Sequence, residues 1–172
     1  EKFGTLDVNL MYIGAKNNVF NSHVEFFSKM KKGTLYGLTP LVNETACGPD
    51  FYEEAKKSGH YIELDPSMSM EEAKEYANKM DVLYTDTWVD MEFFNNPAYQ
   101  KQKEETLAKM MPYQLNGDFT KDSKAIVFHD MPMHVGFEIS QDVVDKNLDH
   151  ILDEAENRRH AEKAVMYTLL NS

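Results

Sequence analysis

The stretch Val8-Asn9-Leu10-Met11-Tyr12-Ile13-Gly14 is largely apolar and ends at a glycine, which is typical of a buried strand that leaves its sheet through a loop. Similar short apolar stretches recur at residues 34–38, 61–64, 82–85 and 125–128. Segments with helical spacing separate them, at residues 19–32, 50–57 and 69–80. Because strands that alternate with helices indicate βαβ units, we predict an α/β fold of three layers: a Rossmann-like, mostly parallel sheet with helices on both faces.

The composition indicates one folded domain. The chain has 172 residues, 42% hydrophobic and 12% aromatic, which supports one core and excludes a disordered protein. A single cysteine, Cys47, excludes a disulfide scaffold and CxxC zinc ribbons, and it favours a reducing, cytoplasmic location. Because the chain starts at Glu1, without a methionine, in a segment that leads into a strand, we expect it to be part of a longer protein.

The charge and the hydropathy pattern exclude two classes of partner. There are 18 basic and 29 acidic side chains, for a formal net charge of −11. Nucleic-acid binding is not expected, because phosphate contacts require clustered Lys and Arg. No apolar run approaches the ~20 residues of a membrane span, so no membrane association is expected.

Ligands of open α/β sheets bind outside the carboxyl ends of the strands, which points to three loops. The loop after Ile13 contains Asn17 and Asn18 but one glycine, whereas a dinucleotide fingerprint needs three. The two asparagines either cap the next helix or, with its first N–H groups, bind a ligand carboxylate or phosphate. Without further context, capping is the favoured interpretation.

The loop after Thr85 places Asp86 directly behind a strand and close to Trp88, the one tryptophan of the chain. A carboxylate there pairs with a ligand ammonium while the ring excludes water. Alternatively, Asp86 forms an Asx-turn and Trp88 belongs to the core. The residues alone give these two interpretations equal weight.

The loop after the last apolar strand reads His129-Asp130-Met131-Pro132 and continues to His134. Pro132 is a candidate for a cis peptide bond, which would direct the Asp130 and Met131 carbonyls toward a ligand. The histidine spacing has no common zinc precedent, so no metal site is predicted. A histidine that hydrogen-bonds the backbone is the favoured interpretation.

An amphipathic helix with an acidic start is predicted near the C-terminus, and it contains Arg158. Arg158 either forms a surface ion pair with Glu154, or turns inward and clamps a phosphate or carboxylate with its fork geometry.

The order and spacing of these motifs carry a resemblance that none carries alone. They comprise residues 1–6, 14–18, 81–89, 112–116, 129–134 and 153–158. Together they resemble the C-terminal half of an ornithine carbamoyltransferase, and the DVxYTDTW-like stretch at 81–88 and the Glu-Ala-Glu-Asn-Arg stretch at 154–158 are quite specific. Aspartate carbamoyltransferases share the fold, but their His-Pro-Leu-Pro-Arg pattern is absent.

The resemblance implies that residues 1–172 are a single domain that binds ornithine or a related amino acid or amine. It closes over carbamoyl phosphate, which an N-terminal domain of the same parent chain would hold. The family's Ser-Thr-Arg-Thr motif for carbamoyl phosphate is not in these residues. The parent would be a homotrimer that makes citrulline in arginine metabolism without a metal or organic cofactor, and the isolated domain is expected to be inactive.

Position by position, the resemblance assigns the roles of the site residues. Asn18 would hold the ornithine carboxylate, and Asp86 its α-amino group. Met131 and Pro132 would present a carbonyl to the carbamoyl group, beside His129 of the same motif. Arg158 would contact carbamoyl phosphate across the closed cleft.

Several residues depart from the family's pattern. The substrate-binding loop after the tryptophan reads Asp90-Met91-Glu92 where the family has Ser-Met-Gly, so Met91 is kept and both of its neighbours are acidic. Asp130 replaces a cysteine and Met131 a leucine, Val135 replaces an arginine, and Gly14-Ala15-Lys16 replaces an acidic Gly-Asp-Gly. A new carboxylate repels a substrate carboxylate and attracts its amine, at about 1–4 kcal/mol for a close pair. We therefore expect the Asp90 and Asp130 pair either to move the substrate preference away from ornithine or to weaken catalysis. Asp130 is also expected to act in catalysis and to neutralise Arg158.

Two other functions remain open. A non-catalytic or substrate-shifted paralogue that serves as a binding or regulatory module is supported by the changed motif residues. A flavodoxin-like receiver or nucleotide-binding domain ranks lower, because no glycine-rich phosphate loop follows the first strand.

Overall fold

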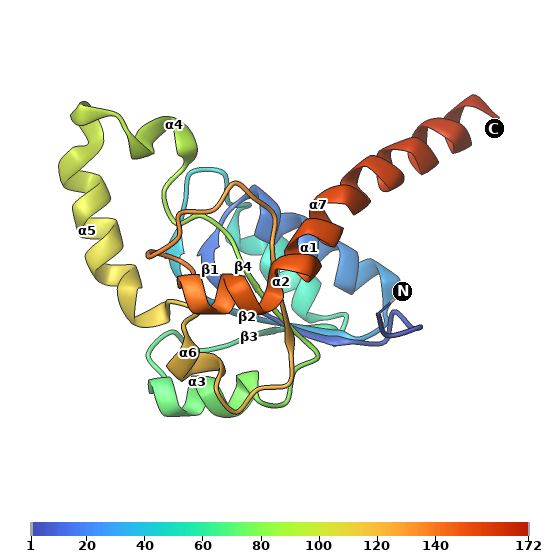
Figure 1. Ribbon diagram of the computed structural model, residues 1–172. Coiled ribbons are helices and arrows are strands. Elements are labelled where there is room, and N and C mark those ends of the chain that lie inside the picture. Colours follow the sequence, from blue (N-terminus) through green and yellow to red (C-terminus); the bar gives the residue numbers. More distant parts are fainter. Residues whose placement is uncertain (1, 172) are drawn as a thin grey trace.

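The computed structural model describes residues 2–171 and leaves the side chain of Met91 undescribed. Five strands form one parallel sheet in the order β3-β2-β1-β4-β5 (Figure 1). Their bounds are β1 (Asn9–Lys16), β2 (Thr34–Val42), β3 (Tyr61–Glu63), β4 (Val82–Thr85) and β5 (Ile126–His129). The predicted α/β fold with a parallel sheet is confirmed.

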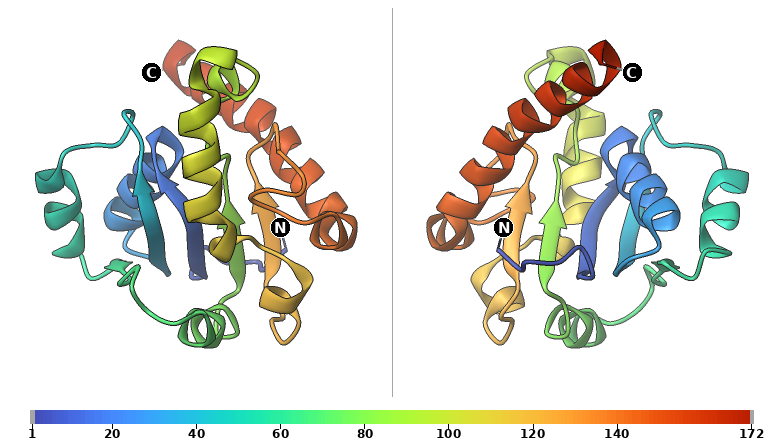
Figure 2. Two further views of the ribbon diagram at one scale, coloured as in Figure 1. Left: turned by 90° about the vertical axis from the view of Figure 1, so that its left-hand side faces the viewer. Right: turned by 90° about the vertical axis from the view of Figure 1, so that its right-hand side faces the viewer.

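Helices cover both faces of the sheet, as Figure 2 shows from two sides. One face packs against α1 (Asn18–Met30) and α2 (Pro49–Lys56). The other packs against α3 (Met70–Ala77), α6 (Gly117–Thr120) and the first half of α7 (Gln141–Leu170). Between β4 and β5 the chain makes a helical excursion for which the sequence analysis made no prediction. It comprises α4 (Met91–Phe94), η1 (Pro97–Tyr99), α5 (Gln100–Met110) and η2 (Met111–Tyr113).

The central strand β1 separates two apolar cores because its side chains alternate between the faces. Met11 and Ile13 join the core under α3 and α7, whereas Leu10 and Tyr12 join the core under α1 and α2. A strand that is apolar on both faces must be covered on both, which is why the first strand stretch is almost continuously apolar.

The end of β1 and the start of α1 differ from the predicted bounds, and the site lies where these two elements meet. β1 does not end at Gly14 but continues to Lys16, with an irregular register between Ile13 and Ala15. α1 begins at Asn18, one residue earlier than predicted. It ends at Met30 because Lys31 takes the left-handed conformation, with φ of 53°.

A capping box was predicted at Ser69, and it is confirmed. The Ser69 hydroxyl accepts from the Glu72 backbone N–H, and the Glu72 carboxylate accepts from the Ser69 N–H. The helix ends at Ala77 rather than at Met80.

The long helix α7 crosses the edge of the sheet and leaves it. Its last deeply buried residue is Ile151, and Figure 1 shows its C-terminal half pointing away from the rest of the domain. Side chains there include exposed apolar ones, such as Val165 and Leu169. Among residues 2–171, no helix has both the length and the apolar character that a bilayer crossing requires.

Two glycines with similar positive φ angles, at which a residue with a Cβ would be strained, provide a test of the packing. Gly33 has φ of 64°, and a Cβ there would lie 2.0 Å from the Val8 carbonyl oxygen; Gly59 has φ of 76° and open space around it. Gly33→Ala should lower the free energy of unfolding by more than about 3 kcal/mol, and Gly59→Ala by about 1 kcal/mol, because only the first adds a clash to the strain. Urea unfolding measures both, and equal losses would contradict this account.

Candidate functional site

Three polar side chains meet where three neighbouring strands end. Asn17 follows β1, Asp86 follows β4, and Asp130 follows β5. Because β1, β4 and β5 lie side by side and run in one direction, their carboxyl ends form one edge of the sheet. This is the edge at which open α/β sheets bind ligands.

Asn17 is the residue that holds this edge together. It is 2% exposed. Its Oδ1 accepts from the Phe20 backbone N–H at 2.9 Å and so caps α1, while its Nδ2 donates to Asp86 Oδ2 at 2.6 Å. Asn18, to which the resemblance assigns the substrate carboxylate, has an exposed side chain, and its backbone N–H faces Thr45 Oγ1 at 3.3 Å. The structure therefore brings Asn17, not Asn18, into the cluster, since α1 starts one residue early.

Asp86 is a buried carboxylate with its oxygens already engaged. Besides the Asn17 amide, it accepts from the Thr87 backbone N–H at 2.6 Å and from Thr87 Oγ1 at 3.3 Å. Trp88 is 1% exposed and belongs to the interior, as the core interpretation predicted. Within the described residues, Trp88 Nε1 has no hydrogen-bond partner.

Asp130 lies against Asp86 and forms a carboxyl–carboxylate pair with it. Burial, the hydrogen bond to Asp86, and the negative charges of Asp86 and Glu154 raise the pKa of Asp130 to about 8. Its side chain is 31% exposed, but Oδ1 is itself buried and has no hydrogen-bond partner among residues 2–171. Two carboxyl groups this close cannot both ionise at ordinary cost, so the pair shares a proton.

Glu154 of α7 completes the cluster, although the sequence analysis considered it only as a partner for Arg158. One of its oxygens accepts from the Tyr84 hydroxyl, and the other from the His129 backbone N–H at 3.0 Å. Burial raises the pKa of Glu154, and these two hydrogen bonds oppose that shift. The residue ties β4, β5 and α7 to one another, and its signal in the sequence was an acidic residue on the inward face of the predicted helix.

His129 is fully buried, and its ring holds the loop that follows it. Nδ1 accepts from the Met131 backbone N–H at 3.0 Å, so Nε2 carries the hydrogen and lies 3.2 Å from Glu138 Oε1. Glu138 also accepts from the His134 backbone N–H. The prediction of a histidine that bonds the backbone is confirmed, and the Met131–Pro132 bond is cis as predicted.

Asp90 and Met91 belong to the substrate-binding loop that departs from the family pattern, and they follow the end of β4. Asp90 is half-buried and precedes α4. Burial raises the pKa of Asp90, and the charges of Asp86, Glu92 and Glu44 act in the same direction. It lines a cavity of about 230 Å³ together with Trp88 and Glu44. The side chain of Met91 lies outside the described residues.

Arg158 is not in the cluster. Its side chain is 83% exposed, and its Nε donates to Glu162 Oε1 at 3.1 Å. The expectation that Asp130 neutralises Arg158 is therefore wrong for this structure, because α7 has left the sheet one turn after Glu154. The surface ion-pair interpretation holds with a different partner, and such a pair contributes little to stability.

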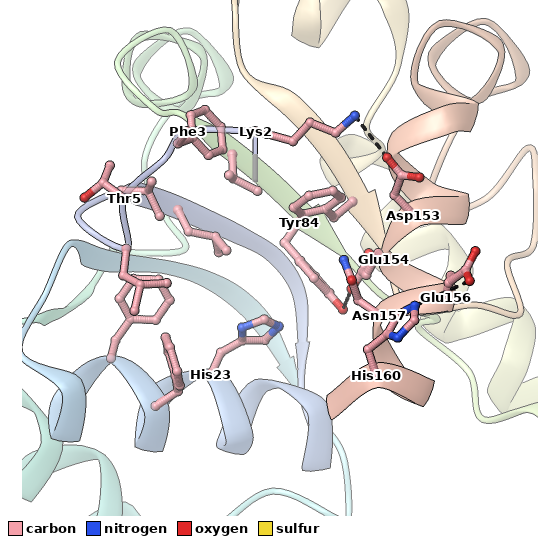
Figure 3. A pocket seen from close by; sticks show the side chains of 17 residues that line it. Lys2, Phe3, Thr5, His23, Tyr84, Asp153, Glu154, Glu156, Asn157 and His160 are labelled. Atoms are coloured by element: carbon pink, nitrogen blue, oxygen red, sulfur yellow. Dashed lines mark hydrogen bonds and ion pairs between the residues drawn. The ribbon is translucent and has the colours of Figure 1, made fainter. Parts of the chain in front are cut away.

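A cavity of about 890 Å³ forms a groove between α1 and α7 on one face of the sheet (Figure 3). Its walls include Phe27, Val82 and Phe128, and it reaches Tyr84 and Glu154 at its polar side. The groove and the acidic cluster therefore share the Tyr84–Glu154 hydrogen bond. Within residues 2–171, no group of three His, Cys, Asp or Glu side chains is arranged to hold a metal ion.

Comparisons with known proteins identify relatives for this arrangement. Residues 6–169 match the family model "Aspartate/ornithine carbamoyltransferase, Asp/Orn binding domain". The ornithine carbamoyltransferase of Chlorobaculum tepidum is 34% identical over 96% of this chain and 46% of its own length. That of Pyrococcus horikoshii is 34% identical over 99% of this chain and 51% of its own length.

Solved structures agree with the sequence relatives. The ornithine carbamoyltransferase of Pyrococcus furiosus superposes with a TM-score of 0.76 at 30% identity, over 96% of this chain and 50% of that one. The anabolic enzyme of Campylobacter jejuni gives 0.77 at 25% identity, over 95% and 52%. The chain spans about half the length of the curated relatives it matches.

The Asp86–Asp130 pair predicts an unusual pH dependence of stability. Since the pKa of Asp130 rises from 3.8 to about 8 on folding, the native state binds more protons than the unfolded state between these values. The free energy of unfolding should therefore fall as pH rises from about 4 to 8, and Asp130→Asn should reduce this fall by at least on the order of 1 kcal/mol. The titratable groups that face Asp130 are Asp86, Glu154, His129, Tyr12 and Tyr84, and burial raises the pKa of both tyrosines above this pH range.

Thermal unfolding across this pH range measures the effect. Asp118→Asn is the matched control, because Asp118 is exposed on α6, its pKa is lowered by Lys74 and Lys121, and its titration lies below the range. A pH profile that Asp130→Asn leaves unchanged would contradict the shared proton.

Proposed function

This chain belongs to the aspartate/ornithine carbamoyltransferase family, through its Asp/Orn binding domain, and we propose that it supplies the acceptor-binding half of a carbamoyltransferase. In this proposal residues 1–172 form a single domain that binds the amine of ornithine or a related compound. Another part of the parent chain, N-terminal to this domain, holds carbamoyl phosphate. The family membership carries the transferase class, and the share of the relatives' length that the chain covers supports the division into halves.

The buried Asp86 carboxylate is the observation that carries the proposal. It lies at the carboxyl ends of the strands, and the amide of Asn17 and the backbone of Thr87 hold it in place. A carboxylate that is already oriented binds an ammonium group without paying for its own ordering. Charge-assisted hydrogen bonds of this kind are about twice as strong as neutral ones.

The proposed reaction balances without a cofactor. The neutral amine nitrogen of the acceptor forms a bond to the carbamoyl carbon, and the bond from that carbon to the phosphate oxygen breaks. Phosphate leaves with the electron pair and takes up the proton that the amine loses, so the products are a ureido compound and hydrogen phosphate. The part of this chain is to bind the far end of the acceptor, to align the attacking nitrogen and to exclude water.

The second candidate function, a non-catalytic or substrate-shifted paralogue, is favoured by Asp130 and by the exposed Arg158. In a closed, full-length enzyme Arg158 would have to turn from Glu162 toward the phosphate. A homotrimeric assembly and a cytoplasmic location stay part of the main proposal, supported by the family and by the single cysteine respectively.

The test uses the full-length gene product that contains these residues. Incubation with carbamoyl phosphate and a panel of amines and amino acids should release phosphate and form a ureido compound with at least one acceptor. Asp86→Asn should lower kcat/KM for that acceptor about ten- to a hundredfold, because the ammonium group then meets a neutral amide in place of a carboxylate.

Asp118→Asn is again the control and should leave the rate unchanged, since Asp118 lies on α6 and pairs with Lys74 and Lys121 at the surface. Circular dichroism checks that both variants fold. Undiminished turnover in Asp86→Asn, or no ureido product with any acceptor, would refute the proposed function.

A further inference from the structure

The acceptor site carries more negative charge than an amino acid requires. Four carboxyl groups surround the ends of β4 and β5, and they come from Asp86, Asp90, Asp130 and Glu154. The charge of Asp86 acts on each of the other three. A single ammonium group neutralises one charge and leaves the cluster negative.

Within the described part of the chain, this negative charge is not balanced by an ion pair with a lysine or an arginine. Among residues 2–171, none of the ion pairs joins a lysine or an arginine to any of these four carboxyl groups. Lys16 pairs with Glu63, and Arg158 with Glu162. Lys103, near Asp90, donates to the Phe94 carbonyl oxygen at 2.8 Å and lies over the ring of the same residue.

The uncharged hydrogen-bond donors at the cluster already donate to its carboxylates. The Asn17 amide donates to Asp86, and the Tyr84 hydroxyl and the His129 backbone N–H donate to Glu154. A substrate carboxylate placed here would therefore face like charges, with these donors already in use. That arrangement penalises an α-carboxylate by desolvation and by repulsion.

One atom of the cluster lacks a partner, and it is an acceptor. Asp130 Oδ1 is buried and makes no hydrogen bond within the described residues, while the other three carboxyl groups are held by neighbours or lie at the rim. A buried unpaired carboxyl oxygen is costly, and a ligand N–H donor would satisfy it. The position is new relative to the family pattern, in which a cysteine precedes the Leu-Pro pair.

We infer that the acceptor is a diamine without an α-carboxylate, one of whose ammonium groups lies between Asp86 and Asp130 while its other amine reaches the carbamoyl carbon. This inference rests on the proposed function and names the substrate class of that site. The bound ammonium takes the place of the proton that the two carboxyl groups share, so binding releases a proton. Because burial and Asp86 hold the pKa of Asp130 near 8, that proton is present at neutral pH before binding.

Isothermal calorimetry on the full-length gene product tests the inference, with and without saturating inorganic phosphate. The probes are 1,4-diaminobutane, ornithine, which is the same chain with a carboxylate, and 1-aminobutane, which lacks the second amine. The diamine should bind at least about tenfold more tightly than ornithine, the difference expected from one close charge pair. Titrations at pH 7 in two buffers of different ionisation enthalpy should show release of about one proton.

Asp130→Asn is the deciding variant, because asparagine is an uncharged side chain of about the same size as the protonated Asp130 and so preserves the fold at neutral pH. It should abolish the proton release and bring the affinities for diamine and ornithine within about threefold of each other. Asp118→Asn should change neither. The inference is overturned if ornithine binds as tightly as the diamine or if no diamine binding is detected. It is also overturned if Asp130→Asn keeps the same preference for the diamine.

The two proposals fail in different ways. If ureido product and phosphate form best with ornithine, the carbamoyltransferase function stands and the diamine preference falls. If the diamine binds with proton release but no acceptor yields a ureido product, the site assignment stands and the catalytic function falls.

Discussion

The hydrogen bond between the Asn17 amide and the Asp86 carboxylate is the constraint on which the rest of the site depends. An ionised carboxylate that is 6% exposed is costly to bury unless donors surround it. The Asn17 Nδ2 atom donates to Asp86, and its Oδ1 atom caps α1. One side chain therefore fixes both the start of the helix and the orientation of the Asp86 carboxylate. Asn17 comes directly after β1, which pairs with β4, and so it lies beside the residue that follows the end of β4.

The negative charge of Asp86 acts on each of the neighbouring carboxyl groups. Asp130 keeps a proton because a second negative charge at hydrogen-bond distance is unfavourable. Glu154 tolerates its half-buried position because Tyr84 and the backbone of β5 donate to it. Such crowding of carboxyl groups costs stability, and proteins accept that cost mainly at functional sites. The cluster is thus a stronger indication of function than the larger apolar groove beside it.

Much of the fold and part of the site were predictable from short-range pattern. Continuous apolar stretches predicted all five strands, and the rule that ligands lie at strand ends directed attention to Asp86, His129 and Asp130. Asn17 was predicted as a cap but not as a partner of Asp86, because the start of α1 was placed one residue late. Glu154 and Arg158 were weighed as a pair, and only the point at which α7 leaves the sheet separates a residue that faces β5 from one that faces solvent.

By itself, the sequence determined the parallel α/β architecture, the loops that carry chemistry and the carboxylates of the altered motifs. These follow from periodicity and from residue type, which act over a few neighbours along the chain. Only the tertiary structure decided that Asp86 and Asp130 share a proton, that Asn17 rather than Asn18 joins them, and that Arg158 does not. Those outcomes depend on distances between residues that are tens of positions apart, and a shift of one residue at a strand end or of one helical turn changes them entirely.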